Sequence, residues 1–242
     1  MDDIAFEIED PSGNRTGVVS FDTPDVTANL GGNICQMVLT EHHRDNGDHL
    51  LKITISPVAA PIQPGPWKLD VIGRTLNSDQ NLVDVWVERH GSRPVYFRKD
   101  EQHVTLSIPG TADTVITVGA CDASTPVRVS AFSSYGRTRQ GNAKPDLCAP
   151  GHGILAAHSN QADTAAVVSK PGTSMAAPHV TGALALAMSH RHKASGKTQL
   201  NANQLQALLK NNLQFFNPRH HPGTGFGVLD VEAFFNAVDA KP

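Results

Sequence analysis

The feature that most constrains this chain is the stretch from Lys170 to Gly182, which reads KPGTSMAAPHVTG. It predicts a loop that turns into a helix with a serine at the junction. Gly172 permits backbone conformations that a side chain would forbid, Thr173 and Ser174 are residue types favoured at helix starts, and Pro178 is expected in the first turn. The residues that follow are apolar on nearly every side, which predicts a buried helix. The hydroxyl and N–H of the serine would then point to where the oxyanion of an acyl transfer is stabilised.

The eleven residues from Gly172 to Gly182 resemble the nucleophile segment of the subtilisin-like serine peptidases. A capping serine on a core helix is the simpler interpretation of an isolated serine, but the length of the match favours the peptidase segment. The G-x-S-x-G elbow of another hydrolase fold does not fit, because an alanine stands at its final glycine position. The resemblance implies that Ser174 is the nucleophile and that its backbone N–H is one oxyanion donor. It also implies that Thr173 and Met175, together with Gly172, support the loop and the helix start.

Four further segments occur in the order that subtilases use. Three resemble segments that precede the nucleophile, and they read TVGACD (117–122), FSSYG (132–136) and KPDLCAPG (144–151). The fourth, GTGFGVLD (223–230), resembles the closing turn before the final helix. The resemblance covers about residues 109–242, and it implies the C-terminal part of a subtilisin-like α/β catalytic domain.

Two domains are predicted, residues 1–106 and residues 107–242. In the first, short β-type runs alternate with turn signals about every ten residues, which favours an all-β sandwich or jelly roll. These runs are 5–9, 17–21, 34–40, 50–56, 67–74, 82–88, 95–98 and 103–108. Residues 64–71 resemble a strand of the jelly-roll domains found beside or inside subtilases, which implies an inserted domain.

The second domain is predicted to be α/β, with buried parallel strands alternating with helices. The apolar run 115–120 is suited to a strand that is covered on both faces. A helix is expected over 203–211, with Asn201 and Gln204 forming a capping box. The last helix is expected to begin near Asp230 and to bury three side chains, Val231, Phe234 and Phe235.

The partners that a catalytic serine needs are not found in this sequence. A serine hydroxyl requires a histidine base oriented by a carboxylate, and subtilases place both of them, and an oxyanion asparagine, before the serine. Residues 10–13 (DPSG) read as a turn, and the histidine of residues 90–92 (HGS) is followed by an arginine and a proline that stop a helix. Asn33 and Asn142 follow glycines but lack a buried strand before them, and His179 is interpreted as structural. No residue is therefore assigned as triad aspartate, triad histidine or oxyanion asparagine.

The expected function is that of a subtilisin-type serine endopeptidase fragment, which is inactive on its own. Two alternatives stay open: a non-catalytic pseudopeptidase or protein-binding module, and one half of a split protease. The expected partners are a peptide or protein substrate and the N-terminal part of the catalytic domain. The net charge of -3 without a basic run argues against nucleic acid. The sequence contains no apolar stretch long enough to span a membrane and no signal peptide, and the compartment stays open although full-length subtilases are often secreted.

No metal or cofactor is predicted. Residues 41–49 (EHHRDNGDH) match no zinc or EF-hand spacing and read as a solvated loop. Asp122 follows the strand near which subtilases can hold a weak Ca²⁺ or Na⁺, but one carboxylate does not establish a site. The three cysteines are widely spaced and are predicted to be buried free thiols, Cys35, Cys121 and Cys148.

Overall fold

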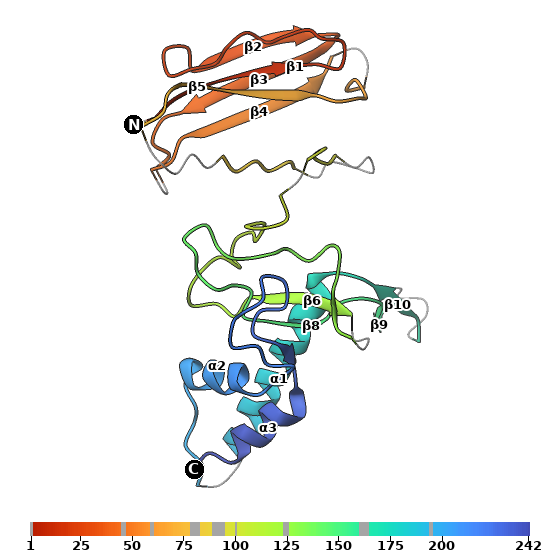
Figure 1. Cartoon of the computed structure of the whole chain (residues 1–242). Helices are drawn as coiled ribbons and strands as arrows, with labels where there is room; N and C mark the ends of the chain where they lie inside the picture. Colours follow the sequence, from red (N-terminus) through yellow and green to blue (C-terminus); the bar gives the residue numbers. More distant parts are fainter. Residues whose placement is uncertain are drawn as a thin grey trace. The chain divides into compact units, whose positions relative to one another are not determined.

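The computed structural model describes residues 2–44, 47–58, 61–77, 83–88, 95–99, 101–122, 126–159, 165–193 and 196–242. The chain forms two compact units, Met1–His90 and Gly91–Pro242 (Figure 1). Within the described residues all helices belong to the second unit. This division lies N-terminal to the domain boundary predicted at residue 106, which stays a prediction.

The first unit consists of antiparallel strands. A three-stranded sheet has the order β2-β3-β4, and a separate pair joins β1 to β5. The strands are β1 (Asp3–Glu9), β2 (Asp25–Leu30), β3 (Asn33–Thr40), β4 (Leu50–Pro57) and β5 (Lys68–Thr75). A two-residue turn connects β2 to β3, and its residues Gly31 and Gly32 have φ values of +55° and +87°. Two left-handed residues in succession are what a tight hairpin of this kind requires.

Both sheets of the first unit contribute to one hydrophobic core. Side chains along β3 alternate between buried and more exposed positions, as expected for a strand with one face on a core. The buried members come from β1, β2, β3 and the loop around Val19, and they are Phe6, Ile8, Val19, Leu30, Cys35, Met37 and Leu39. The unit is therefore all-β as predicted, while its jelly-roll connectivity stays a prediction.

Several predictions of strands in the N-terminal half are wrong. In 17–21 only Val19 forms a β-bridge, to Phe6. The described residues of 82–88, 95–98 and 103–108 contain no strand. Conversely, β2 was not predicted, because DVTANL carries polar residues at its exposed positions. These segments show that alternating β-type residues define a propensity, whereas a strand also needs a neighbour with which to pair.

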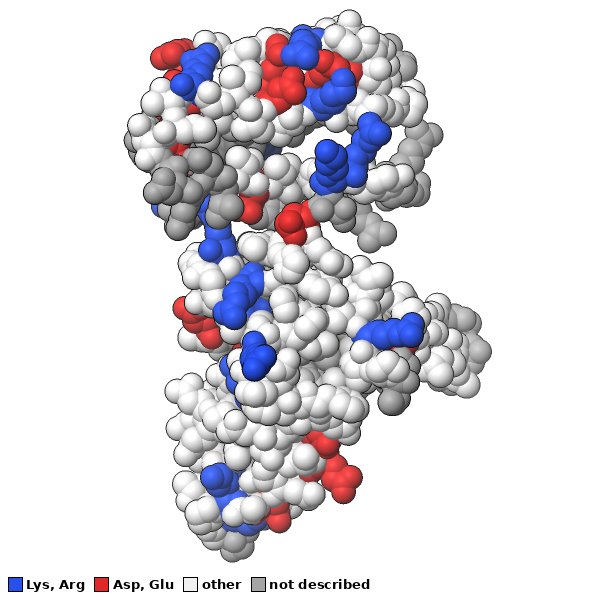
Figure 2. Space-filling view, in the orientation of Figure 1, with Lys and Arg blue, Asp and Glu red and all other residues white. Residues whose placement is uncertain are grey.

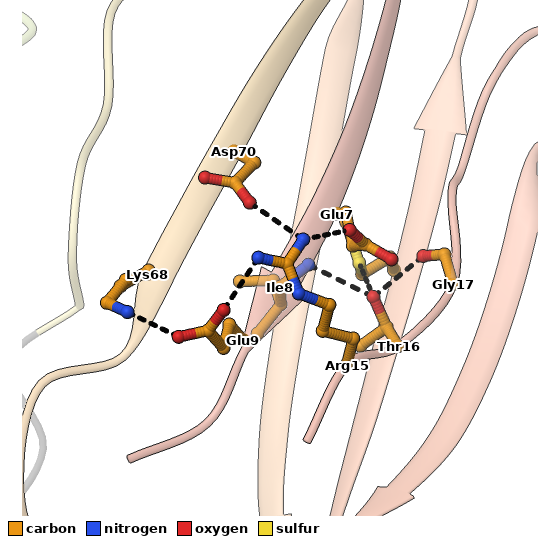
Figure 3. Close-up of polar contacts among 9 residues, drawn as sticks. Glu7, Ile8, Glu9, Arg15, Thr16, Gly17, Lys68 and Asp70 are labelled. Atoms are coloured by element: carbon orange, nitrogen blue, oxygen red, sulfur yellow. Dashed lines mark hydrogen bonds and ion pairs between the residues drawn. The ribbon is translucent and has the colours of Figure 1, made fainter. Parts of the chain in front are cut away.

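Charges of both signs lie side by side on the first unit, as Figure 2 shows. Arg15 donates to Glu7 over 2.5 Å, to Glu9 over 2.7 Å and to Asp70 over 3.2 Å, and Lys68 pairs with Glu9 (Figure 3). The Lys68 ammonium and then the Arg15 guanidinium lower the pKa of Glu9. The two cations of this network are about half-exposed, so each pair contributes little to stability.

The second unit is built on a five-stranded sheet of order β11-β12-β8-β6-β7. Its centre is parallel, since β8 pairs with β6 on one side and with β12 on the other. The strands are β6 (Val118–Asp122), β7 (Arg128–Val129), β8 (Leu147–Pro150), β11 (Leu213–Gln214) and β12 (Val228–Leu229). A separate hairpin pairs β9 (Ile154–Ala157) with β10 (Val167–Lys170). The α/β prediction is confirmed, although β6 begins three residues after the predicted run 115–120 does.

Three helices, α1 (Thr173–Lys193), α2 (Ala202–Asn211) and α3 (Val231–Asp239), pack with this sheet around one core in the described residues. The predicted capping box of α2 is confirmed, because Asn201 and Gln204 exchange side-chain to backbone hydrogen bonds of 2.9 Å. Asp230 caps α3 and Phe234 is buried, both as predicted. Val231 is exposed, contrary to prediction, because it lies on the outer side of the first turn.

Helix α1 is buried along one face only, so the prediction of a helix buried all round is wrong. The buried residues recur every three or four positions, and they are Ala176, Val180, Ala183, Ala187 and Arg191. On the opposite side Leu186 is 61% exposed and Met188 is 53% exposed. The sheet and helices of this unit cover one side of α1, and the apolar residues on its outer side have no cover among the described residues.

Arg191 ties the end of α1 to the end of the chain. Its side chain is buried, and its guanidinium donates to the carbonyl oxygens of Thr198 (3.1 Å), Lys241 (2.7 Å) and Pro242 (2.7 Å). A further bond of 3.4 Å reaches the carbonyl of Val238 in α3. The charge is therefore satisfied by main-chain oxygens, one of them on the last residue, and not by an acidic side chain.

The cysteines are buried and free, as predicted. The neighbouring Cys121 thiol and burial raise the pKa of Cys148, and burial raises the pKa of Cys35, so both remain protonated at neutral pH. No helix in the described part of the chain has the length and hydropathy that a membrane crossing requires.

Asp239 provides a test of how the ends of α1 and α3 are joined. Lys197 at 2.6 Å and then His190 at 2.8 Å lower the pKa of Asp239 from 3.8 to about 2. A carboxyl group whose pKa is lower in the folded than in the unfolded state stabilises the fold at pH values above its unfolded pKa. This contribution disappears as the pH falls to the folded pKa. Asp239→Asn should therefore lower the melting temperature at pH 7, and the difference from wild type should close between about pH 4 and pH 2. In a Lys197→Met background, Asp239→Asn should lower the melting temperature by less. A melting-temperature difference between wild type and Asp239→Asn that is the same at pH 7 and pH 2 would contradict this assignment.

Candidate active site

The turn before α1 is located by backbone contacts to the sheet. Gly151 follows β8 directly, and its N–H donates to the carbonyl of Cys121 in β6 over 3.0 Å. The carbonyl of Gly151 in turn accepts a 2.8 Å bond from the N–H of Gly172. Two consecutive hydrogen bonds thus connect the carboxyl ends of β6 and β8 to the turn that carries Ser174. Functional residues of α/β folds commonly lie at this end of a parallel sheet.

Gly172 closes the turn with a conformation that suits glycine. Its φ is +153°, and its carbonyl accepts hydrogen bonds from Met175 (3.0 Å) and Ala176 (3.3 Å). A Cβ at Gly172 would lie 3.3 Å from the sulfur of Met175, so the methionine side chain packs back over the turn. Thr173 is the first residue of α1. The supporting role of these three residues stays a prediction.

Ser174 lies exposed at the start of α1. Within the described residues no backbone hydrogen bond uses its N–H, which leaves the group free to donate to a bound oxyanion. Pro178 lies inside the helix, one turn beyond Ser174, and not in the first turn as predicted. Because proline has no N–H, the carbonyl of Ser174 lacks its usual partner four residues later.

His179 lies on the same helix as Ser174 and is bonded to that helix. Its Nδ1 lies 2.8 Å from the carbonyl of Met175, one turn earlier, and the ring is exposed. In this arrangement Nδ1 carries the proton and donates it to the carbonyl. The geometry agrees with the structural role predicted for this histidine.

The other residues considered, Asp10 for the triad and Asn33 and Asn142 for the oxyanion asparagine, make structural hydrogen bonds. Asp10 accepts hydrogen bonds from the backbone of Ser12 (2.8 Å) and Asn14 (2.9 Å), as expected for a turn. Asn33 accepts a bond from the backbone of Gln63. Asn142 donates to Asp113 over 2.7 Å. Residues 90–92 lie outside the described residues.

The described residues contain no group of three or more possible metal ligands. The His49 ring lies 4.6 Å from Phe21 and 5.5 Å from His42, centroid to centroid, and His42 also contacts the carbonyl of Gly47 and the carboxylate of Glu41. Residues 45 and 46 of the predicted loop lie outside the described residues. Asp122 ends β6 and is half-buried. No cofactor chemistry is assigned to these side chains.

A buried ion cluster lies at the start of β8, and sequence reasoning missed it. The carboxylate of Asp146 is fully buried and accepts bonds from Lys144 (2.8 Å) and from the backbone N–H of Thr117 (2.7 Å). Lys210 lies 2.6 Å from its other oxygen, and the Lys144 ammonium also donates to the carbonyl of Val115 over 2.6 Å. The cluster fixes the loop that leads into β8, and so it holds the strand from which the turn is positioned.

Sequence reasoning also missed Gly151 as a positioning residue. A Cβ there would lie 2.6 Å from the Cβ of Ala120 and 2.8 Å from the carbonyl oxygen of Gly172. Neither neighbour can move without shifting β6 or the turn. The last glycine of KPDLCAPG was the only signal in the sequence.

Gly151→Ala should destabilise the second unit by about 1–3 kcal/mol, because the added methyl group overpacks a backbone contact. Urea unfolding followed by far-UV circular dichroism measures this unit, because the helices of the described chain all lie in it. Gly182→Ala is the matched control. A Cβ at Gly182 meets nothing within 4 Å, so this variant should be more stable by about 0.5–1 kcal/mol. Equal stability of the two variants would contradict the close contact at Gly151.

Comparison with known proteins identifies relatives of one kind. The family model of the subtilase family matches residues 88–227. The extracellular basic protease of Dichelobacter nodosus is 37% identical over 170 residues, which cover 69% of this chain and 26% of that protein. The extracellular protease of Xanthomonas campestris pv. campestris is 30% identical over 195 residues, or 76% of this chain and 31% of that protein. This chain thus spans about a quarter to a third of the length of these relatives.

One solved structure resembles the full length of the chain. The CspB protease of Clostridium perfringens matches with a TM-score of 0.75 at 23% identity, covering 100% of this chain and 51% of that chain. At this identity the likeness establishes the fold.

Proposed function

This chain belongs to the subtilase family, and on that premise we propose that Ser174 is the nucleophile of a peptide-hydrolysing serine endopeptidase. In the proposed reaction the Ser174 hydroxyl attacks the scissile carbonyl, the amine leaves with a proton, and water then hydrolyses the acyl-enzyme. The Ser174 N–H is one donor to the oxyanion. The observation that carries the proposal is the turn fixed from Gly151 to Gly172, which presents an exposed hydroxyl and a free N–H at the start of α1.

The histidine base, its aspartate and the oxyanion asparagine are proposed to come from polypeptide outside residues 1–242. That polypeptide is a preceding part of the same protein or a separate chain, and with it this chain forms what we term the complete enzyme. The outer side of α1 supports the proposal, since Leu186 and Met188 are exposed on a helix whose composition suits burial all round. The short span of this chain along its relatives also supports it.

The first unit is proposed to be a jelly-roll-like domain inserted before the serine segment. Its two antiparallel sheets around one core support this assignment. The proposed substrates are peptides or proteins. Both bacterial relatives carry the word extracellular in their names, and export of the complete enzyme is proposed by extension.

A fluorophosphonate probe, which reacts with activated serines, tests the proposal. This chain should label weakly by itself and strongly at Ser174 once mixed with the N-terminal catalytic part, taken from the upstream coding sequence or from the Dichelobacter nodosus protease. Peptide mapping locates the label. Strong labelling at another serine would contradict the assignment of Ser174. Absence of labelling although the two parts bind would instead favour the pseudopeptidase.

A further inference from the structure

Most of the charge in the described segments around Ser174 is basic. Residues 126–159 and 165–193 include β8, the β9–β10 hairpin and α1, and their one acidic residue, Asp146, is fully buried in its ion cluster. In β6, which also contacts the turn, Asp122 is half-buried and pairs in register with Arg128 of β7. The exposed charged residues of 126–159 and 165–193 are all arginines or lysines, and they are Arg128, Arg137, Arg139, Lys170 and Lys193. Since the chain as a whole has a net charge of -3, this asymmetry is local.

Among these five basic residues, Lys170 lies nearest to Ser174 in the sequence, directly before the turn. It is the last residue of β10 and pairs with Ile154 in β9, so its backbone is held in a hairpin. Its Cα is at most about 14 Å from that of Ser174, because the two residues are only four positions apart. The side chain is exposed, and no ion pair in the described part of the chain involves it. Its ammonium group is therefore available to a ligand that approaches Ser174.

Flat aromatic surface lies next to Gly151, which holds the same turn. His152 follows Gly151, whose carbonyl holds the turn, and its ring stacks on Phe132 with centroids 6.5 Å apart and planes at 13°. Phe132 is 45% exposed. The segments that form and hold the turn therefore offer two exposed rings, at Phe132 and His152, and one ammonium group, at Lys170.

We infer that Lys170 is a specificity-determining residue, which selects peptides with an aspartate or glutamate side chain next to the scissile bond. This inference rests on the proposed function, because it concerns the substrate of the Ser174 site. The chemical group that is recognised is a carboxylate. A lysine ammonium attracts a carboxylate in water, and added salt screens and weakens this attraction. The free carboxylate at a peptide C-terminus offers the same chemistry, so the experiment separates the two sources.

The test uses the complete enzyme and internally quenched peptides with both ends blocked. Pairs of peptides differ by Glu against Gln at one position near the scissile bond. Wild type should prefer the Glu peptide at one of these positions by about three- to fivefold in kcat/KM, and the preference should shrink with added salt. Lys170→Gln should remove the preference, and Lys170→Glu should favour a peptide with Lys at that position.

Lys193→Gln is the matched control, because it removes the same charge from the far end of α1, about 28 Å along the helix from Ser174. It should keep the wild-type ratio. Ser174-dependent hydrolysis with an unchanged Glu to Gln ratio in Lys170→Gln would overturn the inference and leave the proposed function standing. A preference found only for peptides with a free C-terminus, and lost in Lys170→Gln, would overturn the assignment to a side chain. Hydrolysis of these peptides that persists in Ser174→Ala would refute the proposed function itself.

Discussion

Replacing Ser174 with alanine is expected to lower kcat/KM of the complete enzyme on a quenched peptide by about 10⁴–10⁶-fold. Losing the nucleophile of a serine triad removes the acyl-enzyme route, and losses of this order are typical. The variant should also fail to react with a fluorophosphonate probe. Ser189→Ala is the matched control, because Ser189 is exposed on the same helix four turns away. Equal labelling of wild type and Ser174→Ala would contradict the assignment.

The Ser174→Ala variant should keep its fold, so that lost activity reports on chemistry. Ser174 is exposed, and substitutions at exposed positions without structural partners usually change stability by less than about 0.5 kcal/mol. Urea unfolding of wild type and variant provides the check.

The largest loss of stability is expected for Asp146→Ala, at about 3–5 kcal/mol. The substitution leaves the Lys144 ammonium buried without its carboxylate and the N–H of Thr117 without its acceptor. Unfolding followed by far-UV circular dichroism reports on the second unit. Glu232→Ala, which removes an exposed acidic residue from the first turn of α3, should cost less than about 1 kcal/mol.

A double variant separates the net contribution of this ion pair to stability from the destabilisation that results when one partner is removed. Lys144→Met combined with Asp146→Leu removes both buried charges and should recover part of the stability lost in Asp146→Ala, because apolar replacement of a buried pair is often near neutral, whereas the N–H of Thr117 stays without its acceptor. Non-additivity of the two single variants measures the coupling. A double variant as unstable as the sum of its single variants would show that the two charges do not act as a pair.

Local signals in the sequence predicted local structure well. The capping box of α2 and the cap of α3 at Asp230 depend on residues three positions apart, and both are confirmed. The run 115–120 correctly indicated a central strand, but pairing with β8 begins only at Val118. Directly before Val118, the N–H of Thr117 donates to the side chain of Asp146, and the carbonyl of Thr117 accepts a bond from the N–H of Asp146.

Features that depend on distant contacts could not be predicted in this way. The residues of 82–88 alternate as a strand would, yet the described ones form no strand. The composition of α1 suits cover on all sides, while this chain covers one face. In the site, the serine segment identified Ser174, but the bond between Gly151 and Gly172 joins positions 21 residues apart and has no pattern in the sequence.

The bond from Gly172 to Gly151 has an evolutionary consequence. It joins backbone to backbone, so once both positions are glycine the placement of Ser174 depends little on the exposed side chains beside the turn. Neighbours such as His152, Lys170 and Pro171 can therefore be exchanged during divergence without moving the serine. A scaffold of this kind lets selection for new substrates proceed at those positions, while the reacting group keeps its place.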